Sequence, residues 1–369
     1  MSAARDSELM ARALRLAAKG AATTAPNPTV GCVLVQGDEI VGEGYTSPAG
    51  GPHAEIAALA AAGERAAGAT AYVTLEPCCH TGRTGPCTEA LIAARVARVV
   101  YAVADPNPLV GGGGAAALRA AGVEVEAGVL EAEAEAMNRG FFARMRRGRP
   151  WVRSKLAASL DGRTALADGA SRWITGEAAR RDVHRWRARS GAVLTGIGTL
   201  LRDDPSLTAR PPGGSPRQPL RVIVDARLRT PPDAKTLSLP GQVVIFTTEA
   251  GAAGAGDAWR RRARVEVVRG AAHCDLAEAL ERLASLEVND VWVEAGPGLN
   301  GALLEAGLID ELVVYLAPHI LGDDARGMFS LTPLASLEER IELEIDSVRR
   351  IGRDLRIVAR PMRKRQAKR

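Results

Sequence analysis

Residues 70–87 read TAYVTLEPCCHTGRTGPC. The first six of them are mostly β-branched, aromatic or aliphatic, which predicts a short buried strand over 70–75. Glu76-Pro77-Cys78 ends this strand, and Cys87 starts the next helical pattern. Two cysteines therefore stand at the ends of two elements, with eight residues between them.

A histidine upstream occupies a similar position. His53 opens a predicted helix after the turn residues Gly-Gly-Pro at 50–52. One histidine and two cysteines make three zinc ligands, and a zinc ion with three protein ligands keeps its fourth tetrahedral position for water. His53, Cys78 and Cys87 are therefore the predicted metal ligands.

Glu55 follows His53 by two residues and gives this metal site a chemical role. Zinc lowers the pKa of a bound water toward neutrality, which makes hydroxide available as a nucleophile. Glu55 can take the proton of that water, pass it to a ring and then to departing ammonia. His-x-Glu followed by Pro-Cys and a further Cys is typical of zinc-dependent deaminases. The sequence thus predicts hydrolytic deamination of a pyrimidine-type ring, with Glu55 as the catalytic residue.

The spacing of the two cysteines departs from the usual Cys-x-x-Cys. We interpret the additional residues as a loop over the mouth of the site, because His80 and Arg83 within it suit a phosphate or polar substrate. A closed structural zinc site with Cys79 or His80 as fourth ligand is the alternative, but it leaves Glu55 unexplained. Cys32 is predicted to be a core residue.

The pattern of elements predicts two α/β domains. In the first half, strands are expected at 29–36, 39–45, 70–75, 98–104 and near 123, with helices over 1–16, from 53, from 88, at 115–121 and from 131. A charged run with Gly148 and Pro150 ends the last helix, so the predicted domains are 1–147 and 148–369. In the second half, strands are expected at 152–158, 192–196, 220–225, 243–247, 265–268, 291–294 and 311–317, with helices from 177 and 275.

Composition excludes several classes of protein. The chain has 369 residues, more than one core usually supports, and no apolar run long enough to span a membrane. Charged residues throughout the first 16 positions argue against a secretory signal, which predicts a cytoplasmic location. The net charge of +5 comes from six basic residues within 360–369, interpreted as a solvated tail. We therefore expect no nucleic-acid or membrane partner.

Several further motifs run in order through most of the chain. They are APNPTVGC at 25–32, GGPHAE at 50–55, TLEPCCHTGRT at 74–84, DPNP at 105–108, KLAASLDGRT at 155–164, WIT at 173–175, DDPSLT at 203–208 and VEAGP at 293–297. With these motifs the chain resembles the bifunctional riboflavin-biosynthesis deaminase/reductase family. The resemblance implies a cytidine-deaminase-like three-layer α/β domain followed by a dihydrofolate-reductase-like α/β domain, and a homo-oligomer.

The resemblance also implies substrates and cofactors. The first domain would use Zn²⁺ to deaminate 2,5-diamino-6-(5-phosphoribosylamino)pyrimidin-4-one, and the second would use NADPH to reduce the ribosyl group to ribityl. Asn27, His80 and Arg83 would contact the deaminase substrate. Many relatives carry histidine where this chain has Thr46, so a phosphate contact from that position is in doubt.

For the reductase, the resemblance implies two sets of residues. Those facing NADPH would be Ala157, Trp173, Thr199, Asp203, Ala226 and the glycine-rich run Gly296, Pro297, Gly298, Leu299, Asn300, Gly301 and Ala302, where backbone amides can approach a pyrophosphate. Those facing the substrate would be Lys155, Ser171, Arg187, Leu207, Arg210 and Glu294. The alternatives are a plain strand-to-helix turn for the glycines, solvated cations for Arg187 and Arg210, and a core position for Trp173.

Two other functions stay open on the sequence alone. One is a nucleic-acid-editing deaminase with a basic tail, since such enzymes share the zinc motif. The other is a deaminase whose C-terminal half serves only for dimerisation.

Overall fold

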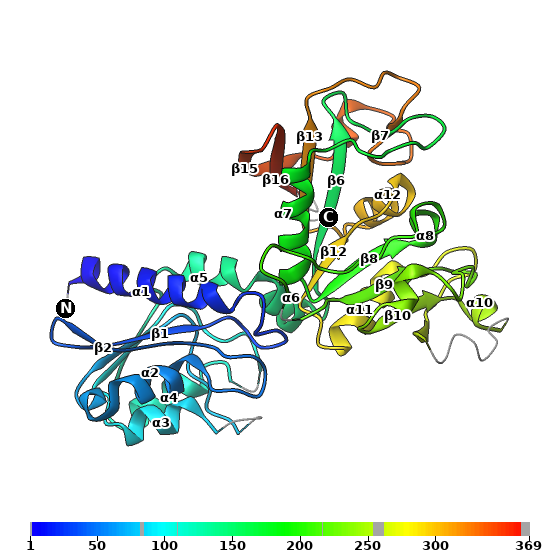
Figure 1. The fold of residues 1–369 in the computed structure, drawn as a ribbon. Helices are drawn as coiled ribbons and strands as arrows, with labels where there is room; N and C mark the ends of the chain where they lie inside the picture. The colour runs from blue at the N-terminus through cyan, green and yellow to red at the C-terminus, as the bar shows by residue number, and fades with distance from the viewer. Residues whose placement is uncertain (1, 82–84, 109, 216, 254–261, 363–369) are drawn as a thin grey trace. The chain divides into compact units, whose positions relative to one another are not determined.

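The computed structural model describes residues 2–81, 85–108, 110–215, 217–253 and 262–362. The chain forms two compact units, Met1–Arg149 and Pro150–Arg369. Each unit is a β-sheet with helices around it and has its own hydrophobic core (Figure 1). The strands predicted in both halves are present, with small differences at their ends.

The sheet of the first unit has the strand order β2-β1-β3-β4-β5. β1 is antiparallel to β2 and β3, whereas β3, β4 and β5 are parallel. The strands are β1 (Gly31–Gln36), β2 (Glu39–Tyr45), β3 (Thr70–Val73), β4 (Arg98–Tyr101) and β5 (Glu124–Ala127). The start of β1 therefore lies at the same edge of the sheet as the ends of β2, β3 and β4.

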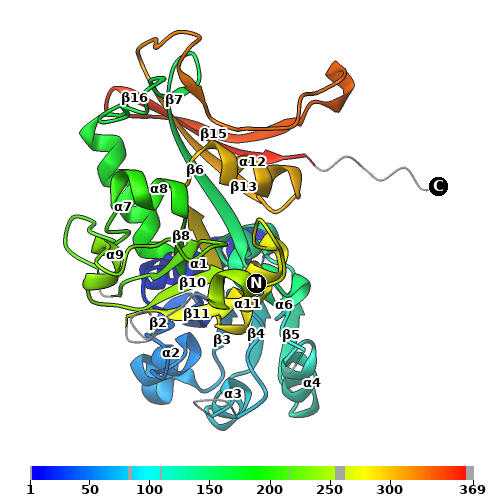
Figure 2. The same cartoon turned by 90° about the vertical axis from the view of Figure 1, so that its right-hand side faces the viewer.

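Helices on both faces of this sheet give three layers. α1 and α5 lie on one side, and α2, α3 and α4 lie on the other (Figure 1), and α2, α3 and α4 are again seen on a common side in Figure 2. The helical segments are α1 (Ala3–Ala17), η1 (Ala18–Gly20), α2 (Ala54–Ala62), η2 (Gly63–Ala66), α3 (Cys87–Ala93), α4 (Gly113–Ala120), α5 (Glu131–Met137) and α6 (Arg139–Arg147).

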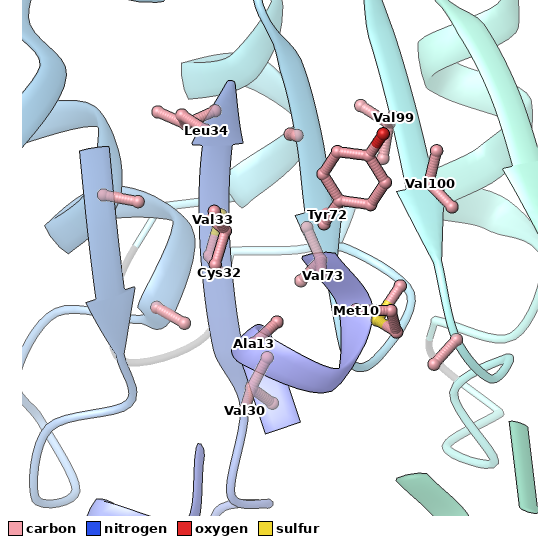
Figure 3. Packing of buried hydrophobic residues seen from close by; sticks show 14 of the residues in the cluster. Met10, Ala13, Val30, Cys32, Val33, Leu34, Tyr72, Val73, Val99 and Val100 are labelled. Carbon is pink, nitrogen blue, oxygen red and sulfur yellow. The ribbon is translucent and has the colours of Figure 1, made fainter. Parts of the chain in front are cut away.

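The centre of this core is β1, which is buried from Gly31 to Val35 because helices cover both of its faces. Met10 and Ala13 of α1 lie against β1 and β3 (Figure 3). The approach is so close that a Cβ on Gly31 would lie 2.0 Å from the Ala13 carbonyl oxygen. Cys32 is fully buried in β1, which confirms its predicted core position.

One predicted helix is wrong in its continuity. The pattern from residue 131 to 147 forms two helices, α5 and α6, which meet at Asn138. Asn138 has φ −112° and ψ 22°, outside helical values. Its side-chain amide forms hydrogen bonds with the backbone of Thr29. Asparagine is unfavourable inside helices because its side chain forms such hydrogen bonds with backbone groups.

The sheet of the second unit has the order β11-β10-β9-β8-β12-β6-β13-β16-β15, and all strands from β11 to β13 in this order are parallel. Their carboxyl ends therefore share one edge. The strands are β6 (Trp151–Ser159), β8 (Ala192–Gly196), β9 (Leu220–Val224), β10 (Val243–Thr247), β11 (Arg264–Val267), β12 (Asp290–Val293), β13 (Glu311–Ala317), β15 (Leu343–Ile351) and β16 (Asp354–Pro361). β7 (Arg163–Ala165) and β14 (Arg326–Gly327) form a separate ribbon.

Two core clusters show which helices cover which face of this sheet. Leu280 of α11 and Leu303 of α12 pack with Leu194, while Val183 of α7 packs with the neighbouring Val193 on the opposite face. The helical segments are α7 (Glu177–Arg189), α8 (Ile197–Asp203), α9 (Lys235–Ser238), α10 (Glu249–Ala253), α11 (Leu276–Ser285), α12 (Pro297–Glu305) and η3 (Leu337–Glu339).

The antiparallel hairpin of β15 and β16 was not expected from the sequence. Arginines interrupt the apolar alternation of these strands, and β15 is largely exposed. The interpretation of residues 360–369 as a solvated tail is wrong for Arg360, which lies in β16 and pairs with Asp346 and Glu344. Residues 363–369 lie outside the described part of the chain. No helix within the described residues is both long and apolar enough to cross a bilayer.

Candidate active sites

The predicted metal ligands meet at one point. His53 precedes α2, Cys78 follows β3 and Cys87 begins α3, and their Nδ1 and Sγ atoms all lie within 4.8 Å of one another. His53 Nδ1 is 3.7 Å from Cys78 Sγ and 3.3 Å from Cys87 Sγ. Two ligands of one tetrahedral zinc ion are roughly 3.5 Å apart, given bonds of about 2.0–2.3 Å, so this donor set fits zinc.

The ionisation of the two cysteines also suits a metal site. Hydrogen bonds from Cys87 and His53 lower the pKa of Cys78 in spite of its burial. The Cys78 sulfur and burial raise the pKa of Cys87. A lowered pKa favours the thiolate form of Cys78, which is the form that binds zinc.

Glu55 lies buried on the first turn of α2, next to this cluster. Burial raises the pKa of Glu55 to about 7, although its own backbone amide and the charge of His53 oppose the rise. A carboxyl group with a pKa near neutrality can both accept and donate a proton at physiological pH. Its position and its ionisation agree with a role in proton transfer.

The structural alternative for the metal site required a fourth ligand from Cys79 or His80. Within the described residues the ligand cluster contains neither. The Cys79 thiol faces the Val110 carbonyl at 4.0 Å and lies close to Gly113. His80 Nδ1 is buried, with no hydrogen-bond partner among the described residues. Arg83 lies outside those residues, and Asn27 is partly exposed in the segment before β1.

Glu76 is a functional neighbour that the sequence reasoning missed. Its buried carboxylate accepts the backbone N–H groups of Gly112 and Ala115, each at 3.0 Å, and that of Asp105 at 3.3 Å. The first turn of α4 also packs closely against this segment, because a Cβ on Gly114 would lie 2.0 Å from the Pro77 carbonyl oxygen. The segment that leads to Cys78 is thus held by the start of α4. An acid between a buried strand and Pro-Cys was the available signal.

The second unit contains a cavity of about 850 Å³. Eleven of the predicted reductase residues line it: Lys155, Ala157, Ser171, Trp173, Arg187, Thr199, Asp203, Arg210, Glu294, Gly296 and Pro297. Trp173 is 68% exposed, which is incompatible with a core position, and the Arg180 guanidinium lies 4.5 Å from its ring centroid.

The other predicted reductase residues do not line the cavity: Leu207, Ala226, Gly298, Leu299, Asn300, Gly301 and Ala302. Leu207 is buried in the cluster around Trp292. Asn300 bonds Ser154 and the Ala295 carbonyl inside the fold. A Cβ on Gly301 would lie 2.0 Å from the Ser330 carbonyl oxygen, so this glycine serves close packing. Most of the glycine-rich run therefore builds α12, and only Gly296 and Pro297 reach the cavity.

An ion pair stands in the wall of the cavity. Arg187 Nε and Nη2 donate to the two carboxylate oxygens of Glu294 at 2.6 and 2.7 Å. Trp292 Nε1 donates to the same carboxylate at 2.8 Å. Burial opposes ionisation of Glu294, yet Arg187 and Lys155 lower its pKa to about 2. Burial and the Arg187 charge lower the pKa of Lys155.

One face of α7 forms part of the lining. Arg180, His184 and Arg187 follow i, i+4, i+7 spacing, and all three line the cavity. His184 Nδ1 accepts the backbone N–H of Arg210 at 3.2 Å, and burial with the charges of Arg187 and Arg210 lowers the pKa of His184 to about 4. His184 and Arg180 were missed as site residues, although this helical spacing was visible.

Comparison with known proteins covers both units. Residues 3–103 match the cytidine and deoxycytidylate deaminase zinc-binding region, and residues 150–357 match the RibD C-terminal domain. The riboflavin biosynthesis protein RibD of Escherichia coli (strain K12) is 48% identical over 95% of this chain and 98% of its own length. That of Haemophilus influenzae is 46% identical over 96% and 97%.

Solved structures agree over nearly the whole chain. Acinetobacter baumannii RibD, form 1, has a TM-score of 0.92 at 44% identity, covering 98% of this chain and all of its own (100%). A Thermotoga maritima deaminase/reductase has a TM-score of 0.87 at 32% identity, with 98% and 99% covered. The first unit is thus cytidine-deaminase-like and the second dihydrofolate-reductase-like, which confirms the expected fold class.

Fold and site together define a two-domain enzyme that joins a zinc-dependent deaminase to an NADPH-dependent reductase. The chain belongs to the RibD family of bifunctional riboflavin-biosynthesis deaminase/reductases. The predicted function and both cofactors are confirmed at this level. A C-terminal half that serves only for dimerisation is excluded, because that half is a reductase domain.

Proposed function

We propose that residues 1–147 deaminate 2,5-diamino-6-(5-phosphoribosylamino)pyrimidin-4-one and that residues 148–369 reduce the ribosyl group of the product to ribityl. The convergence of His53, Cys78 and Cys87 beside the buried Glu55 carries the first half of this proposal. The Thermotoga maritima relative, described as a diaminohydroxyphosphoribosylaminopyrimidine deaminase and 5-amino-6-(5-phosphoribosylamino)uracil reductase, supports the choice of substrate.

In the deaminase, His53, Cys78 and Cys87 hold the metal, and Glu55 moves the proton. Zinc bound by these three ligands supplies a Lewis acid that lowers the pKa of a water molecule. A carboxylate oxygen of Glu55 takes the first proton of the attacking water and delivers it to a ring nitrogen. It then takes the proton of the new hydroxyl group on the tetrahedral carbon and delivers it to the amino group, which leaves as ammonia. Asn27, His80 and Arg83 orient the substrate. The buried Nδ1 of His80, with no partner among the described residues, is available for a substrate contact.

In the reductase, the chain supplies binding groups around a cofactor that carries the hydride. Among the described lining residues of the cavity, lysines and arginines outnumber acids, which suits a dinucleotide together with a phosphorylated sugar. We assign the NADPH side to Ala157, Trp173, Thr199, Asp203, Gly296 and Pro297, and the substrate side to Lys155, Ser171, Arg187, Arg210 and Glu294. Ala226, Leu207 and residues 298–302 act through the backbone or through packing.

Arg187 and Arg210, the two arginines predicted on the substrate side, take different parts in this proposal. Arg187 already gives two donors to Glu294 and a third, Nη1, to the Thr208 carbonyl at 2.9 Å. Arg210 Nη1 donates to the hydroxyl groups of Ser206 and Thr208. Arg210 is therefore the better candidate for the substrate phosphate, while Arg187 fixes the carboxylate of Glu294 in the wall of the cavity.

A coupled assay tests the two activities. Purified protein receives the diaminopyrimidine ribotide, ammonia release is followed with and without a chelator, and NADPH oxidation is followed afterwards. We expect chelator-sensitive ammonia release and then NADPH consumption. Ammonia without NADPH use would contradict the reductase assignment, and the absence of both signals would contradict the whole proposal.

We also propose that the enzyme acts on small molecules in the cytoplasm, without a nucleic-acid partner. Basic and acidic residues nearly balance outside residues 360–369, which leaves the folded body without a strong positive charge. Deamination of a polynucleotide, with binding that weakens steeply with salt, would contradict this.

A homo-oligomer is the remaining part of the proposal. β15 lies at the edge of the large sheet, and four apolar side chains of the β15–β16 hairpin are exposed by 38–60%: Leu343, Ile345, Val348 and Leu355. Exposed apolar side chains on an edge strand favour pairing with a second copy. In sedimentation, the wild type should behave as an oligomer and Ile345→Asp as a smaller species. A monomeric wild type would contradict the proposed homo-oligomer.

A further inference from the structure

Three consecutive backbone amides at the start of β1 are each bound by a side chain from a distant part of the chain. The bonds join Thr29 N to Asn138 Oδ1 at 2.8 Å, Val30 N to Thr46 Oγ1 at 3.2 Å and Gly31 N to Thr74 Oγ1 at 3.1 Å. We call Thr46, Thr74 and Asn138 the β1 clasp. All three side chains are buried.

Each member of the β1 clasp also bonds the backbone in the reverse direction. Asn138 Nδ2 donates to the Thr29 carbonyl at 2.9 Å, so its amide pairs with Thr29 as a neighbouring strand would. The backbone N–H groups of Thr46 and Thr74 donate to the carbonyls of Val30 and Gly31, at 2.9 and 3.1 Å. The segment is thus fixed on both its donors and its acceptors.

The β1 clasp joins the segments that carry the deaminase site. Thr46 follows β2 and leads to His53, and Thr74 follows β3 and leads to Cys78. Asn27 precedes Thr29 by two residues, on the short approach to β1. Because β1 is antiparallel to β2 and β3, this approach lies at the sheet edge from which both ligand segments start.

Thr46 and Asn138 are two positions of the first unit at which the chain departs from simple expectation. The Thr46 hydroxyl group is buried against the backbone of Val30, where it also lies 3.4 Å from the carbonyl oxygen, so it is not directed to a substrate phosphate. Asn138 interrupts the helical pattern between α5 and α6 to reach Thr29. Both features are explained if these side chains fix the backbone of the segment that carries Asn27.

We propose that Thr46, Thr74 and Asn138 are positioning residues of the deaminase, which hold Asn27 where it contacts the pyrimidine substrate. This inference rests on the proposed substrate contact of Asn27. The β1 clasp acts through the backbone at 29–31, which its three side chains bind.

A double-mutant cycle of Asn27→Ala and Asn138→Ala, followed by ammonia release, tests the proposal. Each single variant should lower kcat/KM roughly tenfold, the effect of about 1.4 kcal/mol. The double variant should be no slower than Asn27→Ala alone, because Asn138 then has nothing left to position. Losses that multiply in the double variant would overturn the proposal. An unchanged Asn27→Ala would instead remove the role of Asn27 itself, and with it the basis of the inference.

A matched pair at Thr46 provides the control for folding. Thr46→Val keeps the shape but leaves the Val30 N–H unpaired, whereas Thr46→Ser keeps the hydroxyl group. We expect Thr46→Val to lose kcat/KM as Asn138→Ala does and Thr46→Ser to stay near wild type, with zinc content and reductase kcat/KM unchanged in both. Equal activity of the two Thr46 variants would overturn the proposal, even if Asn138→Ala proves too unstable to purify.

Discussion

At the scale of single residues, Glu55 is the group on which deamination depends most directly. Glu55→Gln keeps the size and the burial of the side chain but cannot accept the proton of water. We expect ammonia release to fall by at least ~100-fold, the usual contribution of a general acid–base group. Zinc content and NADPH oxidation with the deaminated substrate should be unchanged. A variant that still deaminates at the wild-type rate would remove the assigned role.

The adjacent cysteines Cys78 and Cys79 provide a matched pair for the metal site. Cys78 Sγ is one of the clustered donors, whereas the Cys79 thiol lies against Val110 and Gly113. Cys78→Ser should lower the zinc content from about one ion per chain toward none, and Cys79→Ser should keep it. Elemental analysis of both purified variants measures this. Loss of zinc from Cys79→Ser would mean that the ligand set differs from the one in the structure.

Candidate site residues could be predicted from the sequence where a short motif with a typical spacing indicates their chemistry. His53, Glu55, Cys78 and Cys87 were predicted in this way, because each stands at or next to the end of an element in a recognisable order. Glu76 was missed because its partners lie 29 to 39 residues away and are backbone amides, which a sequence does not mark. The same holds for Asn138, which is bonded to a residue 109 positions distant.

At the scale of elements, the Glu294–Arg187 pair joins the end of β12 to the last turn of α7. The pKa of Glu294 is about 2 in the folded protein, below its ordinary value of 4.5. The stabilisation from this pair is therefore fully present above pH ~4.5 and is lost as the pH falls toward 2. The net stabilisation of the ionised Glu294 by Arg187, Lys155 and Trp292 together, after the cost of burial, is of the order of 3 kcal/mol.

Denaturant unfolding of the wild type and Glu294→Gln at several pH values measures this contribution. All five tryptophans of the chain follow residue 150, so their fluorescence reports on the second unit. Between pH 5 and pH 3 the wild type should lose more free energy of unfolding than Glu294→Gln, because only the wild type has this carboxylate to protonate. Parallel curves for the two proteins would show that the pair contributes nothing.

Elements were predictable where apolar periodicity was regular. β8, β10 and β13 were found with their bounds unchanged, since buried parallel strands are nearly continuous apolar runs. β15 and β16 were missed because arginines and acidic residues interrupt their apolar alternation, so that in composition these strands differ little from a solvated loop. The end of α5 was missed because the backbone conformation of Asn138 depends on its hydrogen bond with the distant Thr29 and not on local helix propensity.

At the scale of the whole molecule, the two units have separate cores, and the predicted zinc ligands all belong to the first. Each half of the sequence carries its own alternation of strands and helices, and for this reason two domains could be predicted without a structure. Removal of the metal should therefore act on one unit and leave the other intact.

Chelation tests this separation in one experiment. Zinc binds the folded first unit more tightly than the unfolded chain, so its removal lowers the stability of that unit by mass action. Ammonia release should be lost, and thermal unfolding followed by far-ultraviolet circular dichroism should show a transition at lower temperature. Tryptophan fluorescence, which reports only on the second unit, should unfold at the same temperature as before, and NADPH oxidation with the deaminated substrate should continue. Return of zinc should restore deamination. If the unfolding temperature seen by fluorescence fell together with that seen by circular dichroism, the two units would unfold as one cooperative body. If the unfolding temperature seen by circular dichroism did not change, the metal would serve catalysis without stabilising the fold.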